Sequence, residues 1–235
     1  MVIDLKNVDV WMTDGTALEG AINLMAGYIV GSTTFTVDGF VGSVPDGALM
    51  LLDGVIYEVV SATDTMGNTT SITIASPGLL VAAVDDDPIT VYGNSIRIKV
   101  GEGNLTWSEK KPREYKKDRG RLDTIRDADE EPMDVSFTMN YEFITASSGD
   151  PPTPEDALKQ RGEAADWVSA DVDDPCAPYC VNILLLHTPP NCTTIEKELV
   201  ILPTFYYESL DHDPKAGTIQ AAGKCNALEA TVSRV

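Results

Sequence analysis

Residues 101–137 read GEGNLTWSEKKPREYKKDRGRLDTIRDADEEPMDVSF, and the interpretation of the rest of the chain depends on this pattern. A short alternation of apolar and polar residues at Leu105–Ser108 predicts a strand, and a longer one at Met133–Ala146 predicts a returning strand. The charged residues between them predict a long hairpin-like arm. Because ordering such an arm costs conformational entropy, we expect a partner surface to hold it.

Most other apolar runs are also short, alternate with a period of two and are broken by Gly, Asp, Asn or Pro, which is typical of β-strands. Asp53-Gly54 predicts a type I′ hairpin turn, because both central residues of that turn need a positive φ angle. Met66-Gly67-Asn68 predicts a second hairpin tip, and Ala17–Ala26 fits either a strand or a short helix. The other predicted strands are Val2–Met12, Thr34–Val37, Ala48–Leu52, Val55–Ala62, Thr70–Ala75, Ile89–Tyr92, Ser95–Val100, Val181–His187, Leu199–Tyr207, Gly217–Ala222 and Ala227–Arg234.

One helix is predicted, from Pro154 to about Val168. Thr153 is its expected N-cap, Pro154 its first helical residue, and Asp156 occupies the capping-box position. The fold class is therefore mainly β. We expect a β-sandwich or barrel with one short helix and a long charged arm, together with a small inserted β-barrel.

The composition is that of a globular protein rather than a disordered one. The chain has 235 residues, of which 43% are hydrophobic and 23% are charged, and its formal net charge is −20. This charge argues against a protein that grips nucleic acid or anionic lipid with its whole surface. No apolar run is long enough for a membrane-spanning helix, and the first residues do not have the pattern of a signal peptide, so we expect synthesis in a cytoplasm.

The charge is unevenly distributed along the chain. No Lys or Arg occurs between Lys6 and Arg97, whereas ten of the 17 basic residues and five acidic residues fall between Arg97 and Arg126. This basic segment fits an electrostatic contact with an acidic partner, which could be a second copy of the chain. It also fits a solvated hairpin whose charges provide solubility.

The distribution of strands predicts two domains. Residues 17–93 contain several short strands and no basic residue, which suggests a small β-domain inserted at the turn after Met12-Thr13-Asp14-Gly15. Residues 1–16 and 94–235 hold the longer strands and form the main domain, which is discontinuous in sequence.

No motif predicts an enzyme. The sequence lacks the nucleophile elbow, the phosphate-binding loops and the zinc-protease motif, and we expect no catalytic role for His187 or His212. The acidic triplet Asp85-Asp86-Asp87 lacks the ligand spacing of a calcium loop and is better interpreted as a solvated turn. We expect no metal and no cofactor, with a zinc site formed by four cysteines as an alternative: Cys176, Cys180, Cys192 and Cys225.

The pattern GEGNLTW…EY…DRGRLDTIRDADEEPMDVSF resembles the major tail tube proteins of tailed, siphophage-like bacteriophages. The resemblance also covers the first strand with Asp14-Gly15 and much of the chain after Asn94, including Pro203-Thr204-Phe205 and Gly223-Lys224-Cys225-Asn226. The inserted segment is similar to small β-modules of phage structural proteins through its runs DGVIYEVVSATDT and ITIASPGL.

The resemblance implies a virion structural protein, not an enzyme. It would be a tail tube subunit that assembles into stacked, hexameric rings in the virion tail and forms the conduit for DNA ejection. The implied partners are other copies of the chain and the tape measure, tail terminator and baseplate proteins, while DNA passes without specific binding and no membrane is involved. Strands at Met133–Ala146 and Leu199–Tyr207 would form the inner wall, and the inserted domain would lie outside the tube.

The arm would then form the contact between subunits. The residues assigned to this interface are Lys110, Lys111, Arg113, Tyr115, Lys116, Lys117, Arg119, Arg121 and Arg126. Two alternatives are a tail terminator or baseplate ring on a related fold, and a zinc-binding β-module.

Overall fold

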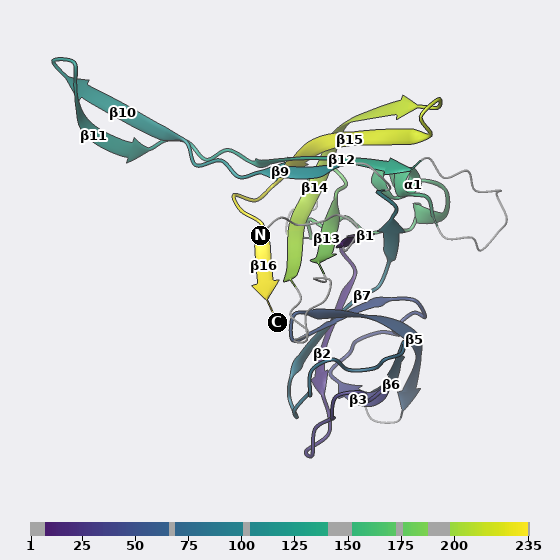
Figure 1. Ribbon diagram of the computed structural model, residues 1–235. Helices are drawn as coiled ribbons and strands as arrows, with labels where there is room; N and C mark the ends of the chain where they lie inside the picture. The colour runs from purple at the N-terminus through teal and green to yellow at the C-terminus, as the bar shows by residue number, and fades with distance from the viewer. Residues whose placement is uncertain are drawn as a thin grey trace.

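The computed structural model describes residues 8–65, 69–100, 104–140, 152–172, 176–187 and 198–234. The fold is mainly β, with one short α-helix and a small closed barrel inserted into a larger β-structure, which confirms the predicted fold class (Figure 1). The predicted hairpin tip Met66-Gly67-Asn68, the start of Val2–Met12 and the end of Met133–Ala146 lie outside the described residues.

The larger sheet has eight strands. Seven follow one another in the order β8-β1-β13-β14-β15-β12-β9, and β16 pairs with β14 beside this path. The strands are β8 (Ser95–Ile98), β1 (Val8–Thr13), β13 (Val181–His187), β14 (Glu198–Asp213), β15 (Thr218–Cys225), β12 (Met133–Asn140), β9 (Leu105–Ser108) and β16 (Thr231–Arg234).

The long strand β14 joins the two halves of this sheet. Its first half pairs with β13 and its second half with β15, and the change of partner falls at Phe205. Beside it, Thr204 has a φ of 46°, which is uncommon for a β-branched residue and marks the bend. After the bend, strands β14 and β15 approach each other so closely that a Cβ on Gly223 would lie 2.0 Å from the Tyr206 carbonyl oxygen.

The bend allows the two halves to enclose one hydrophobic core. β12 alternates strictly between buried and half-buried residues, so that Met133, Val135, Phe137 and Met139 all point inward. The other half of the sheet contributes residues such as Met12 and Ile183 to the same core. The large domain is therefore a sandwich whose two layers share β14.

The inserted barrel is closed in the order β2-β3-β6-β5-β4-β7. Asp53 and Gly54 both have positive φ values, 50° and 74°, which confirms the predicted type I′ turn between β4 and β5. The segment Ala17–Ala26, for which the sequence fitted either a strand or a short helix, contains the strand β2. The barrel strands are β2 (Ala17–Ile22), β3 (Thr34–Asp38), β4 (Leu49–Leu52), β5 (Val55–Thr65), β6 (Thr69–Ile74) and β7 (Pro88–Tyr92).

The barrel packs on the sheet through a separate apolar cluster. Leu49, Ile56 and Tyr92 of the barrel meet Leu184, Leu186 and Leu199 of the sheet, and all six are buried. Because β13 has the sandwich core on one face and the barrel on the other, its apolar run is nearly continuous. The first half of β14 is covered in the same way, with Val200 and Leu202 in the core and Leu199 against the barrel. The expectation that it faces a channel is therefore wrong.

Asp14 holds the junction between barrel and sandwich. Its carboxylate accepts hydrogen bonds from the Thr16 amide (3.0 Å), the Thr16 hydroxyl (3.0 Å), the Asn94 side-chain amide (2.7 Å) and the Val168 amide (3.1 Å). Gly15 has no room for a side chain, since a Cβ there would lie 2.0 Å from the Ser169 carbonyl oxygen. The two ends of the insertion thus meet at one buried carboxylate.

The helix is shorter than predicted. α1 (Pro154–Lys159) begins as expected, with the Thr153 hydroxyl accepting a hydrogen bond from the Asp156 amide at 3.0 Å. It ends at Gln160, whose φ is 48° and whose side-chain amide donates to the Trp167 carbonyl. A 3₁₀ turn, η2 (Gly162–Ala164), follows. The left-handed residue explains why the helical pattern does not continue to Val168.

Candidate functional site

The arm is a two-stranded hairpin that projects from the sandwich (Figure 1). β10 (Arg113–Asp118) pairs with β11 (Arg121–Asp127), and the turn residues Arg119 and Gly120 have φ values of 49° and 82°. Positive φ at both turn positions gives the twist that a two-residue hairpin needs. The sequence-predicted interface residues from Arg113 to Arg126 all lie on this hairpin and are exposed.

The pairing of the strands places opposite charges across from one another. Arg113 lies opposite Asp127, Glu114 opposite Arg126, and Asp118 opposite Arg121. Residues directly opposite on antiparallel strands have side chains on the same face, so these charges compensate each other locally. Lys116 faces Thr124 and Lys117 faces Leu122, which leaves the positive character concentrated near the tip.

The arm also exposes apolar side chains, of which the sequence reasoning assigned Tyr115 to the interface but missed Leu122 and Ile125. Tyr115 lies directly opposite Ile125, and their side chains are 58% and 50% exposed. Leu122, nearer the tip, is 57% exposed. The alternation of Tyr115 with charged neighbours and of Ile125 with Thr124 and Arg126 carries this signal in the sequence. The arm therefore presents apolar surface as well as charge.

The root of the arm is tied to the sandwich. The Lys110 ammonium lies 2.6 Å from Asp134 and 3.4 Å from Glu131. The hydrogen bond with Asp134 raises the pKa of Lys110, and the same bond lowers the pKa of Asp134. Of the predicted interface residues, Lys110 thus already has partners within its own chain, while Lys111 beside it is exposed.

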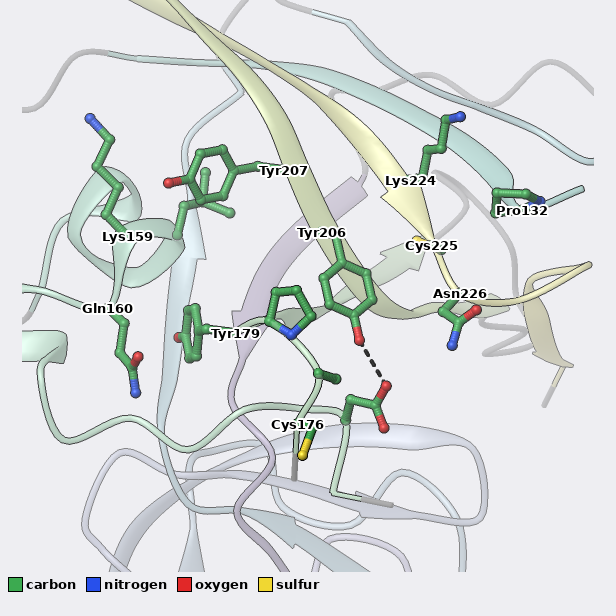
Figure 2. A pocket seen from close by; sticks show the side chains of 14 residues that line it. Pro132, Lys159, Gln160, Cys176, Tyr179, Tyr206, Tyr207, Lys224, Cys225 and Asn226 are labelled. Carbon is green, nitrogen blue, oxygen red and sulfur yellow. Dashed lines mark hydrogen bonds between the residues drawn. The ribbon is translucent and has the colours of Figure 1, made fainter. Parts of the chain in front are cut away.

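A second candidate site is an open pocket of about 810 Å³ between α1, the bend of β14 and the end of β15. Figure 2 shows the rings of Tyr179, Tyr206 and Tyr207 at this pocket, with Lys159 and Lys224 at its edge. The other lining residues are Pro132, Leu158, Gln160, Asp171, Cys176, Ala177, Pro178, Cys225 and Asn226.

Hydrogen bonds fix two of these tyrosines. The Tyr206 hydroxyl donates to Asp171 at 2.7 Å, and the Tyr179 hydroxyl donates to the Ala157 carbonyl at 2.8 Å. Burial raises the pKa of both phenols, and for Tyr206 the bond to Asp171 adds to this effect. Both phenols therefore stay neutral at physiological pH, and their rings form aromatic walls of the pocket.

The cysteines do not gather into a metal site in the described part of the chain. No group of three His, Cys, Asp or Glu side chains that could hold a metal occurs among these residues, and Cys192 lies outside them. Cys176 is exposed, whereas Cys180 and Cys225 are buried. Burial raises the pKa of Cys225 to about 12, so its thiol is protonated near neutral pH.

The histidines are likewise separate. His187 ends β13 and is buried. His212 belongs to β14, and its Nε2 lies 3.4 Å from the Glu155 carboxylate. The described residues do not bring the two histidines together in any metal-binding group.

Comparison with known proteins gives no relative: no family model, no curated protein and no solved structure matches the chain. Within the part of the chain that the structure describes, no helix has the length and apolar character needed to cross a membrane.

Proposed function

We propose that this protein is a structural subunit of an assembly, specifically a major tail tube subunit that forms stacked, hexameric rings around a DNA conduit. The observation that carries the proposal is the projecting arm. An isolated two-stranded hairpin is marginally stable in water, and this one exposes Tyr115, Leu122 and Ile125. Docking of the arm on a neighbouring subunit would bury these side chains and pair the charges near its tip.

The layers of the fold suggest where a channel would lie. The outward face of the layer formed by β9, β12 and β15 is polar, with Thr106, Ser136, Thr138 and Gln220 among its side chains. The barrel packs on the opposite layer, against β13 and β14. A channel lined by the polar face would therefore place the barrel on the outside of the tube.

This face suits passage of DNA without retention. Affinity for the phosphate backbone comes mainly from Lys and Arg side chains. Hydroxyl and amide groups dominate the outward positions of β12, which are Asp134, Ser136, Thr138 and Asn140. Lys224 on β15 is the one cation at the outward positions of β12 and β15, and Asp134 lies near enough for the two charges to interact. Such a wall would let the DNA backbone slide past.

The proposal is tested by negative-stain electron microscopy of the purified protein at high concentration. A tail tube subunit gives long tubes of stacked rings with an open bore. Single rings that never stack would favour the tail terminator or baseplate ring. A protein that stays monomeric at every concentration and ionic strength would refute the proposal.

A further inference from the structure

The barrel carries an exposed apolar patch at the end where β2 stops and β7 begins. Met25 is 94% exposed, Ile29 78% and Val84 60%, and Leu24 and Val30 are exposed beside them. These side chains lie in two loops, after β2 and before β7. Clusters of exposed apolar side chains on a soluble domain usually mark an interaction surface.

Backbone contacts hold the two loops together, so their exposed apolar side chains lie on neighbouring segments. Tyr28 and Ala83 form a β-bridge, with the Tyr28 amide donating to the Ala83 carbonyl at 2.7 Å. The Leu24 amide donates to the Asp85 carboxylate at 2.9 Å. A Cβ on Gly27 would lie 3.3 Å from the Val84 Cα, which shows how closely the loops approach.

The surroundings of this patch are acidic. Asp85, Asp86 and Asp87 follow Val84 directly, and Asp53 lies at the adjacent β4–β5 turn. Asp53 and Asp87 are close enough that the negative charge of Asp87 contributes to a raised pKa for Asp53, after the larger effect of burial. No Lys or Arg occurs between residues 7 and 96 to offset these charges. The patch therefore favours a partner that is both apolar and positively charged, and it disfavours anionic lipid.

We propose that this end of the barrel, the patch of Leu24, Met25, Ile29, Val30 and Val84 with its rim of aspartates, docks a basic, apolar segment of a separate partner protein. The apolar side chains supply the contact area, and the aspartates select a segment that carries Lys or Arg. The patch lies on the inserted barrel, whereas the tail tube proposal rests on the arm.

The test measures binding of a defined probe to the full chain, kept dilute enough to remain unassembled. The probe is a cyclised peptide copy of residues 111–129, since this segment is both basic and apolar. Two matched probes carry Lys116→Glu with Lys117→Glu, or Tyr115→Ser with Ile125→Ser. We expect saturable binding of the first peptide, weakening with added salt, and at least about tenfold weaker binding of each altered peptide.

Variants of the chain locate the binding site. Met25→Lys with Ile29→Lys should weaken probe binding at least about tenfold. The control is Val41→Lys, because Val41 is 90% exposed on the same barrel. Its neighbour Gly42 lies near Leu18 at the start of β2, whereas the patch follows the end of that strand. All substituted side chains are exposed, and circular dichroism verifies that each variant is folded.

Three outcomes overturn the proposal. The first is no saturable binding of the basic peptide at millimolar concentration. The second is equal binding to the Met25/Ile29 variant. The third is loss of self-association in that variant, which would assign the patch to the arm of a second copy. Normal self-association with lost probe binding supports the proposal, whereas a chain that never assembles refutes the tail tube function and leaves the probe result standing.

Discussion

The carboxylate of Asp14 accepts a hydrogen bond from the backbone amide of Val168, a residue 154 positions later in the chain, at 3.1 Å. The same carboxylate also bonds Asn94, which follows the inserted barrel. One buried side chain thus connects the end of β1, the exit of the barrel and the segment after the helix.

Replacing Asp14 with Ala should destabilise the protein strongly. The change removes the buried carboxylate and leaves the Val168 amide and the Asn94 amide without this acceptor at a part-buried junction. We expect a loss of about 2 to 4 kcal/mol in the free energy of unfolding, measured by urea denaturation. Asp46→Ala, at an exposed barrel position, is the control and should change stability by less than about 0.5 kcal/mol.

Reversing the charge near the arm tip should block assembly without unfolding the subunit. Lys116 and Lys117 lie opposite the uncharged residues Thr124 and Leu122. The variant Lys116→Glu with Lys117→Glu should keep the wild-type circular dichroism spectrum but sediment as a monomer. Lys215→Glu, at an exposed turn outside the arm, should still assemble. Normal tubes from the double variant would show that these charges do not mediate the contact.

The apolar surface of the arm makes a separate prediction. Tyr115→Ser with Ile125→Ser removes the exposed cross-strand pair but leaves the net charge unchanged. If docking buries this pair, the variant should assemble at least about tenfold more weakly, and added salt should not rescue it. Analytical ultracentrifugation over a range of concentrations measures the effect. Assembly at the wild-type concentration would show that this pair is not part of the contact.

The ion pairs of Glu155 predict a pH dependence. Burial would raise the pKa of Glu155, but the hydrogen bond from Lys159 and the nearby charges of Arg161 and His212 lower it below its usual value. A lowered folded-state pKa contributes stability above the unfolded value of about 4.3, and this stability is lost as the pH falls through the folded pKa.

Glu155→Gln should therefore be less stable than wild type at pH 7, and the difference should shrink below about pH 4.3. Urea denaturation at a series of pH values measures the difference. Glu163→Gln, at an exposed position of η2, is the control and should follow the wild-type curve. A difference that does not change with pH would show that Glu155 stabilises the fold through packing rather than charge.

Much of the fold could be predicted from the sequence because its local signals are strong. The Asp53-Gly54 turn, the Thr153 cap and the alternation in β12 each depend on residues close together in the chain. The predicted end of the helix was wrong because Gln160 adopts a left-handed conformation, which its residue type does not indicate. The bend of β14 at Thr204 depends on pairing with two different strands, which local patterns do not record.

The candidate sites were less predictable because they depend on strand register and on contacts between segments that are distant in the sequence. The charges of the arm were visible in the sequence, but their mutual compensation depends on the register that places Glu114 opposite Arg126. The pocket is lined by Tyr179 from one segment and by Tyr206 and Tyr207 from another, with residues 188–197 between them in the sequence. Local sequence patterns do not show that these segments lie side by side. The junction at Asp14 could not be predicted because its hydrogen bonds join residues that are far apart in the sequence, such as Asp14 and Val168.

The closed barrel also has a kinetic consequence. It separates β1 from β8 by many residues, yet Thr13 and Ser95 are paired neighbours in the sheet. Once the barrel has formed, its two ends emerge together, and the entropy cost of closing that long loop has already been met. The barrel then acts for β1 and β8 as a tight turn does for a hairpin. Refolding should therefore show the barrel gaining protection from hydrogen exchange before the β1–β8 ladder does.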